Sequence, residues 1–215
     1  MEFLIDNLDK VLSGFLNTIG LFAISGLSAL VIGTVVAAMR VSPIPVLRGV
    51  GTVYVNFFRN TPLLVLLIIT VFGLPELGVN PSFFIKSSLA MSFYTAAFVC
   101  EALRSGVNAI PLGQAEAARS VGMSFGTTMT QVVLPQALRA VVPPLASVLI
   151  ALVKNTSLAS SFGILEATAR MKGLINDDPG ALWFIFVGIA VGYVVIVELI
   201  SLLAGALERR WRVAR

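Results

Sequence analysis

The stretch VLSGFLNTIGLFAISGLSALVIGTVVAAM, residues 11–39, contains no charged side chain. A helix needs about 20 mostly apolar residues to cross the hydrocarbon core of a bilayer, so this stretch predicts a membrane-spanning helix. The whole chain has the same character: of its 215 residues 57% are hydrophobic and 12% are charged, whereas roughly a quarter of a soluble domain is charged. The composition therefore predicts an integral membrane protein.

Four further apolar stretches predict one all-α domain over residues 1–215, a helical bundle with about five spanning helices. Three of these stretches carry charges near their ends, which long Lys and Arg side chains tolerate by reaching the membrane surface. The alternative for the shorter stretches is a buried or re-entrant helix. The predicted spans lie near residues 14–38, 54–74, 83–105, 138–158 and 181–207.

The distribution of Lys and Arg predicts the orientation. With the N-terminus outside and the C-terminus in the cytoplasm, most of the 15 basic residues fall on the cytoplasmic side. They lie beside the predicted spans, so the net charge of +4 does not indicate a nucleic-acid partner. The absence of His and the single Cys100 exclude a His/Cys metal site, a Cys–His nucleophile pair and a disulfide within the chain.

A polar block, GQAEAARSVGMSFGTTMTQVVLP at residues 113–135, interrupts the apolar chain. It predicts two short helices, because Pro111 suits a helix start, Gly122 suits a helix end and Ser124 suits an N-cap. In the predicted orientation the segment 108–135 is cytoplasmic. From these residues alone, it is either an ordinary amphipathic connector or a rigid knob that meets a partner.

The block also resembles a known signature. The pattern Glu-Ala-Ala, three residues, Gly, nine residues, a branched aliphatic residue, any residue and Leu-Pro is typical of the permeases of ABC importers. Here it consists of Glu116, Ala117, Ala118, Gly122, Val132, Leu134 and Pro135. Other stretches resemble the polar amino-acid branch of that family (glutamate, glutamine and histidine type), most of all actinobacterial glutamate permeases. They are MRVSP (39–43), RNTPLL (59–64), EALRSGV (101–107) and KNTSLAS (154–160).

The resemblance implies a type I ABC-importer permease that imports a polar amino acid across the bacterial plasma membrane, and it favours glutamate as that amino acid. It also implies coupling helices that sit in a groove of a cytoplasmic ATPase. The coupling residues would be Glu116, Ala117, Ala118, Arg119 and Gly122. Glu116 and Arg119 are one helical turn apart and share a face.

The partners follow from the same resemblance. The chain has no phosphate-binding G-x-x-x-x-G-K-[ST] loop, so ATP and Mg²⁺ are expected in the ATPase, and no cofactor or metal in this chain. The resemblance implies a second permease, a paralogue rather than an identical copy, and two cytoplasmic ATPase subunits. It further implies an extracellular substrate-binding protein or lipoprotein, an amino-acid substrate and membrane lipid, and no nucleic acid.

The segment KNTS predicts the substrate path. Its polar residues, Lys154, Asn155, Thr156 and Ser157, interrupt an apolar helix. A broken helix exposes backbone groups, which a membrane tolerates only inside protein or beside water. Those groups could hold an α-carboxylate or α-ammonium group, with Lys154 balancing an acidic substrate. The alternative is the ordinary chemistry of a helix end, with Lys154 reaching the membrane surface.

The segment RNTP predicts a helix start near the cytoplasmic end of the second span. Asn60 or Thr61 would be the N-cap and Pro62 would lie in the first turn. The sequence therefore favours a structural role for Arg59 and Thr61, and a role in a gate is the alternative.

Two acidic residues are predicted to act as gates or structural contacts. Glu166 and Arg170 are four residues apart, which predicts a solvated ion pair on an outer amphipathic helix that could also gate the path or meet the binding protein. Glu198 lies inside the last span, and its position predicts a structural pair with an arginine of this or the second permease.

Two alternatives from other classes stay open. An ion-coupled amino-acid carrier or channel would need intramembrane charges, of which only Glu198 lies clearly within a span, and the chain shows no internal repeat. A membrane-embedded enzyme could use a Ser157–Lys154 pair, but no oxyanion-hole motif accompanies it. Dependence on ATP separates the importer from the carrier.

Overall fold

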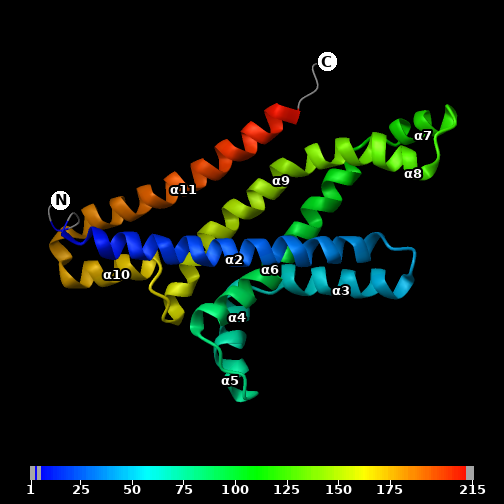
Figure 1. Ribbon diagram of the computed structural model, residues 1–215. Coiled ribbons are helices and arrows are strands. Elements are labelled where there is room, and N and C mark those ends of the chain that lie inside the picture. The colour runs from blue at the N-terminus through cyan, green and yellow to red at the C-terminus, as the bar shows by residue number, and fades with distance from the viewer. Residues whose placement is uncertain (1–2, 4–5, 212–215) are drawn as a thin grey trace.

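The computed structural model describes residue 3 and residues 6–211, and every regular element within them is helical (Figure 1). The expected all-α fold is therefore confirmed. The helices are α2 (Leu8–Val41), α3 (Pro45–Asn60), α4 (Leu63–Ile68), α5 (Leu74–Glu76), α6 (Phe83–Asn108), α7 (Leu112–Ser120), α8 (Phe125–Thr128), α9 (Leu134–Asn155), α10 (Ala167–Asp177) and α11 (Leu182–Trp211). Two π-helical segments, η1 (Ile69–Gly73) and η2 (Met129–Val133), and two 3₁₀ segments, η3 (Thr156–Phe162) and η4 (Pro179–Ala181), join some of them.

The number of spanning helices agrees with the predicted number of about five. Four helices of the described residues are long and apolar enough to cross a membrane, and a bent pair makes a fifth if the pair forms one span. The four are Leu8–Val41, Phe83–Asn108, Phe125–Phe162 and Pro179–Arg210, and the bent pair is Pro45–Asn60 with Leu63–Glu76.

The span predicted near residues 54–74 is not one straight helix, because α3 and α4–α5 meet at a bend of 100°. Pro62 lacks an N–H and disfavours helical backbone in the preceding residue, and Thr61 accordingly has extended backbone (φ −98°, ψ 128°). The predicted cap is wrong. The Thr61 hydroxyl donates back to the Phe57 carbonyl oxygen at 2.8 Å, so Thr61 ends α3, and α4 begins at Leu63.

Helix α6 is the centre of the bundle. It is the most buried of the spanning helices and packs against α2, α3, α4 and α9. Small residues make this burial possible because they let helix backbones approach closely. At the α2 crossing, a Cβ atom on Gly33 would lie 2.7 Å from the Cβ of Val99. At the α9 crossing, a Cβ on Gly106 would lie 3.0 Å from the nitrogen of Val141 and 3.1 Å from the carbonyl oxygen of Ala137.

Lys86, near the start of α6, turns its side chain into the protein. Its side chain is buried, and the ammonium group donates to the Val71 carbonyl oxygen at 3.2 Å and to Asn80 Oδ1 at 2.7 Å. The same nitrogen lies 4.9 Å from the centroid of the Phe83 ring. Lys86 therefore ties η1 and the loop after α5 to α6.

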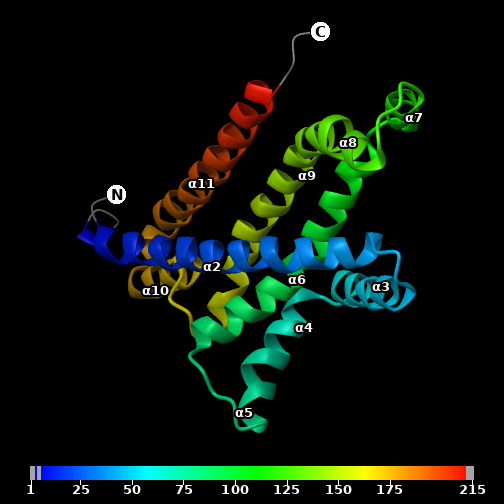
Figure 2. The same ribbon diagram turned by 45° about the vertical axis from the view of Figure 1, so that its right-hand side comes forward.

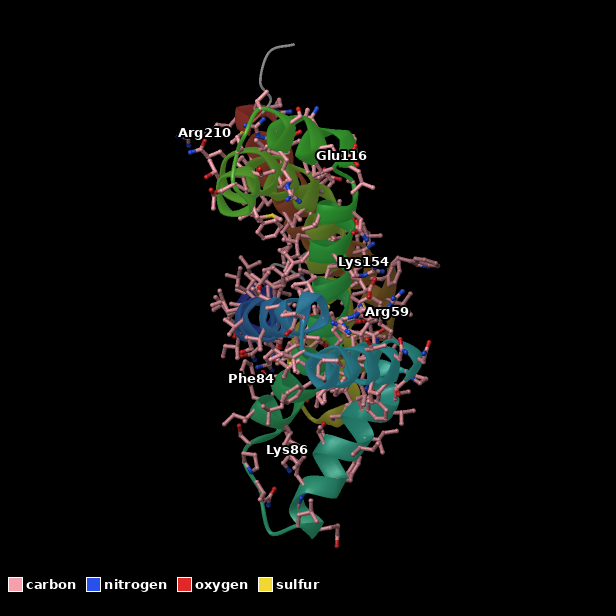
Figure 3. All side chains as sticks on the ribbon, turned by 90° about the vertical axis from the view of Figure 1, so that its right-hand side faces the viewer. Arg59, Phe84, Lys86, Glu116, Lys154 and Arg210 are labelled. Carbon is pink, nitrogen blue, oxygen red and sulfur yellow. The ribbon has the colours of Figure 1, made fainter. Side chains whose placement is uncertain are left out.

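The bundle has two distinct ends. Figures 1 and 2 place α7 and α8 toward the same end as the C-terminal end of α11, whereas α5 and α10 lie away from that end. Figure 3 agrees, because Glu116 and Arg210 lie near one end, Lys86 lies toward the other, and Lys154 and Arg59 lie between them. Residues 112–128, which contain α7 and α8, are called the coupling block below.

Gly106→Ala is expected to lower the free energy of unfolding by about 1–3 kcal/mol, because the added methyl group meets backbone atoms of α9. The matched control is Gly49→Ala in α3, where a Cβ meets no atom within 4 Å and the change is expected to be neutral or stabilising. Thermal unfolding in detergent measures both variants. Equal melting temperatures would show that the α6–α9 crossing is not tight.

Candidate functional site

One of the two predicted short helices, α7, forms in the coupling block, whereas α8 is the first turn of the continuous helix Phe125–Phe162. At the end of α7, the N–H of Met123 donates to the Ala118 carbonyl oxygen at 3.2 Å, and the N–H of Gly122 donates to that of Arg119 at 3.0 Å. Gly122 has φ +86°, a conformation that glycine adopts without strain. Ser124 caps α8 by accepting a backbone N–H at 3.2 Å. These caps make the block a defined unit rather than a loose loop.

The predicted coupling residues lie mostly on the surface of this block. Glu116, Ala117, Arg119 and Gly122 are exposed, whereas Ala118 is buried. Within the described residues, neither Glu116 nor Arg119 forms an ion pair with another part of the chain. Both charges are therefore free to meet a partner surface.

Three large apolar side chains on the block were not predicted to be functional. Leu112 is 81% exposed, Val121 is 79% exposed and Phe125 is 67% exposed. Exposed apolar groups beside charged ones are typical of a surface that a partner covers. The sequence could have indicated these side chains, because each of the three is an apolar residue at a helix end in a block that is otherwise polar.

The KNTS segment breaks helix α9 as predicted, but its four side chains do not converge. α9 ends at Asn155, and a 3₁₀ segment follows. The Thr156 hydroxyl is buried and donates to the Val153 carbonyl oxygen at 2.7 Å, and the Ser157 hydroxyl donates to that of Lys154 at 2.7 Å. Two of the four polar groups are thus hydrogen-bonded to their own chain.

Three of the four side chains line two different cavities. Lys154 and Ser157 line a cavity of about 480 Å³ among α9, α10 and α11, with Thr168, Tyr193 and Glu198 and several apolar residues. Asn155 lines a second cavity of about 240 Å³, between α6 and α9. We call these the α9–α11 cavity and the α6–α9 cleft.

Glu198 lies where the α9–α11 cavity meets α11. Its side chain is exposed, and within the described residues it forms no ion pair with an arginine of this chain. Among the described residues, the predicted pair with an arginine of this chain is therefore absent, and a pair with an arginine of the second permease stays a prediction. Glu198 and Lys154 instead place opposite charges on the wall of one cavity.

Glu166 does not form the predicted exposed ion pair with Arg170. Its side chain is completely buried, because Glu166 precedes α10 with extended backbone (φ −80°, ψ 179°) and turns back as the N-cap. Oε1 accepts the N–H of Ala169 at 2.8 Å, and Oε2 accepts the N–H of Thr168 at 2.9 Å and the hydroxyl of Tyr193 at 2.7 Å. The carboxylate therefore joins α10 to α11.

A contact with α2 completes this network. The Thr18 hydroxyl lies 3.5 Å from Oε2 of Glu166 and accepts the N–H of Ala167 at 3.2 Å. Thr168 and Tyr193 share a further hydrogen bond at 3.1 Å between their hydroxyl oxygens, and both line the α9–α11 cavity. Glu166 thus orients two of the polar groups on the wall of that cavity.

Glu101 is the charged centre that the sequence reasoning missed. It forms an ion pair with Arg40 of α2, a hydrogen-bonded pair with Arg104 at 2.9 Å and an ion pair with Arg59 of α3 at 3.7 Å. Three guanidinium groups around one carboxylate join α2, α3 and α6. The sequence offered only the pair with Arg104, three residues further along the same helix, because Arg40 and Arg59 come from two other helices.

Comparison with known proteins agrees with this architecture. Residues 29–213 match a protein family described as the binding-protein-dependent transport system inner membrane component. The glutamate transport system permease protein GluC of Corynebacterium glutamicum is 39% identical, over 96% of this chain and 96% of its own. The glutamate/aspartate import permease protein GltJ of Escherichia coli K12 is 34% identical, over 93% of this chain and 86% of its own.

Solved structures match over the same length. The crystal structure of an amino acid ABC transporter with histidines has a TM-score of 0.88 at 29% identity and covers 96% of both chains. An inward-facing structure of the MetNI methionine ABC transporter has a TM-score of 0.77 at 22% identity and covers 97% of this chain and 99% of its own. The second likeness concerns the fold alone.

Glu166→Ala is expected to lower the free energy of unfolding by about 2 kcal/mol or more, because α10 loses its N-cap and the Tyr193 hydroxyl loses its acceptor. Glu76→Ala in α5, which removes an exposed carboxylate, is the control and should change stability little. Thermal unfolding in detergent measures the difference. A Glu166 variant as stable as wild type would contradict the assigned network.

Proposed function

The chain belongs to the family of inner membrane components of binding-protein-dependent transport systems, and from this we propose that the amino acid it imports is glutamate. It is the membrane-embedded permease subunit of an amino-acid ABC importer with the type I fold, a transport subunit rather than an enzyme. GluC and GltJ, whose names specify glutamate, match nearly the whole chain and support that choice of substrate.

The observation that carries the ATP-driven mechanism is the coupling block. The chain has no phosphate-binding loop, so the energy of ATP must reach it through contact with another subunit. A rigid unit transmits such motion, and the capped helices with exposed Glu116 and Arg119 form a rigid unit. The Mg²⁺ and ATP would lie in that ATPase subunit.

The assembly is proposed in more detail. Permeases of ABC importers work with a further permease, an ATPase and a substrate-binding protein. We propose a paralogous second permease, two ATPase subunits below the coupling block and an extracellular binding protein or lipoprotein. Helix α11 supports the second permease, because it is the least buried of the spanning helices in the described chain.

The proposed orientation places the N-terminus outside and the C-terminus in the cytoplasm of a bacterial cell membrane. The coupling block and the C-terminal end of α11, with Arg209 and Arg210, lie toward the same end of the bundle (Figures 1 and 3). A basic tail beside the ATPase-facing block is consistent with the excess of basic residues on cytoplasmic loops.

The substrate path is proposed to include the KNTS segment. Lys154 and Glu198 place opposite charges on the wall of the α9–α11 cavity, and Lys154 could balance the additional carboxylate of glutamate. Asn155 offers an amide in the α6–α9 cleft. The hydroxyl groups of Thr156 and Ser157 are hydrogen-bonded to carbonyl oxygens three residues earlier, where α9 ends and the 3₁₀ segment begins.

Uptake of labelled glutamate by vesicles that carry the complete complex tests this function. Uptake should require internal ATP and should be blocked by unlabelled glutamate or aspartate but not by arginine. Block by arginine or histidine instead would keep the importer and reject the acidic substrate. Uptake that ignores ATP and follows an ion gradient would support the ion-coupled carrier and reject the coupling role of the block.

Gly122→Asp and Glu116→Lys are expected to reduce ATP-dependent uptake strongly while the purified permease stays folded. The first change forces a side chain into a left-handed backbone conformation at a cost of roughly 1–2 kcal/mol, and the second reverses a charge that meets the ATPase. Gly113→Ala, where a Cβ meets no atom within 4 Å, is the control. Variants that assemble poorly but transport normally would contradict the coupling role.

A further inference from the structure

The α6–α9 cleft has a mostly apolar lining that also includes polar residues outside the predicted substrate path. It is lined by Tyr94, Thr95, Ser147 and Asn155, together with Phe98, Val148, Ala151 and Leu152. A binding site for a small molecule typically combines an apolar wall with a few polar groups in this way. The volume of about 240 Å³ suits a ligand smaller than a drug molecule.

Arg59 lies beside this cleft. Its guanidinium carbon is 5.8 Å from the centroid of the Phe98 ring, and Phe98 is part of the cleft wall. Phe98 precedes Glu101 by about one turn of α6, on the side of the cleft nearer the coupling block. Arg59 therefore approaches one end of the cleft, while Asn155, the last residue of α9, lies on its lining at the end of α9 farther from the block.

Of the three guanidinium groups around Glu101, that of Arg59 is the one without a hydrogen bond to the carboxylate. Arg40 and Arg104 both hydrogen-bond to the carboxylate, whereas Arg59 Nη1 lies 3.7 Å from Oε2 and forms no hydrogen bond within the described residues. The Arg59 side chain is 45% exposed, against 20% for Glu101. A guanidinium has five N–H donors, so Arg59 has donors available for another acceptor.

We infer that Arg59 binds the α-carboxylate of the amino acid in the α6–α9 cleft. A planar guanidinium pairs with a carboxylate through two parallel hydrogen bonds, and the Phe98 ring, 5.8 Å from the guanidinium carbon, gives Arg59 a cation–π contact at the cleft. Every amino acid has an α-carboxylate, so this role does not depend on the side chain of the substrate. The inference rests on the proposed function only in that the ligand is an amino acid.

Glu101 competes with the ligand for Arg59. When the cleft is empty, the carboxylate of Glu101 attracts the guanidinium across 3.7 Å, and an incoming carboxylate replaces that attraction. Arg40 and Arg104 remain on Glu101, so its carboxylate keeps two partners after the exchange. A ligand held by exchange of this kind can also be released when Arg59 returns to Glu101.

The test measures binding of labelled glutamate to the complete permease–ATPase complex, without external binding protein, by equilibrium dialysis. Unlabelled isoglutamine, in which the α-carboxylate of glutamate is an amide, serves as the competitor. Wild type should prefer glutamate to isoglutamine. Arg59→Gln should weaken glutamate binding by roughly tenfold or more and remove that preference, because the paired hydrogen bonds are lost.

Arg59→Lys separates binding from a merely structural role. Lysine keeps the charge opposite Glu101 but lacks the planar fork, so glutamate binding should still weaken while the melting temperature and assembly stay at wild-type values. Arg48→Gln is the matched control, because Arg48 donates to the carbonyl oxygens of Ser42 and Pro43 and lies on no cleft wall. Its binding should equal that of wild type.

The other outcomes decide the inference as well. Unchanged binding in Arg59→Lys and Arg59→Gln would overturn it, and so would a wild-type complex that binds no amino acid in the absence of binding protein. A wild type that binds another amino acid in place of glutamate would reject the glutamate proposal alone. The role of Arg59 is then decided with that amino acid and its α-amide.

Discussion

The close approach of α6 to its neighbours is the constraint on which the rest of the structure depends. Lipid tails are as apolar as leucine side chains, so helices in a bilayer associate through tight packing and hydrogen bonds rather than through the hydrophobic effect. Gly33 and Gly106 supply that packing at the two largest crossings, and Glu101 adds an electrostatic link to α2 and α3. Because α6 leads directly toward the coupling block, a displacement of the block acts on the helix that the others surround.

The sequence predicts the features that depend on local chemistry. The number of spanning helices follows from apolar length, and the coupling block follows from a glycine with positive φ and a serine cap. The bend between α3 and α4 was readable in principle, because Pro62 restricts Thr61, although the cap itself was assigned to the wrong helix. In each case the residues that decide the structure are neighbours in the chain.

Features that depend on contacts between distant helices were not predicted. Glu166 meets Thr18 across 148 residues and Tyr193 across 27, and that contact turns an expected surface ion pair into a buried cap. Glu101 gathers arginines from two other helices, and the KNTS side chains divide between two cavities because different helices flank the two sides of α9. Spacing along one helix cannot reveal which helix lies opposite.

The bend at Pro62 has a consequence for the thickness of the bilayer. A helix over Leu63–Glu76 rises by only about 20 Å, whereas the hydrocarbon core is about 30 Å thick. Either the bilayer thins around this segment or the end of α3 enters the hydrocarbon. In the second arrangement Arg59 lies where water is scarce, and a low dielectric constant strengthens its attraction for any carboxylate that arrives. Hydrophobic mismatch would then tune how strongly the permease holds its cargo.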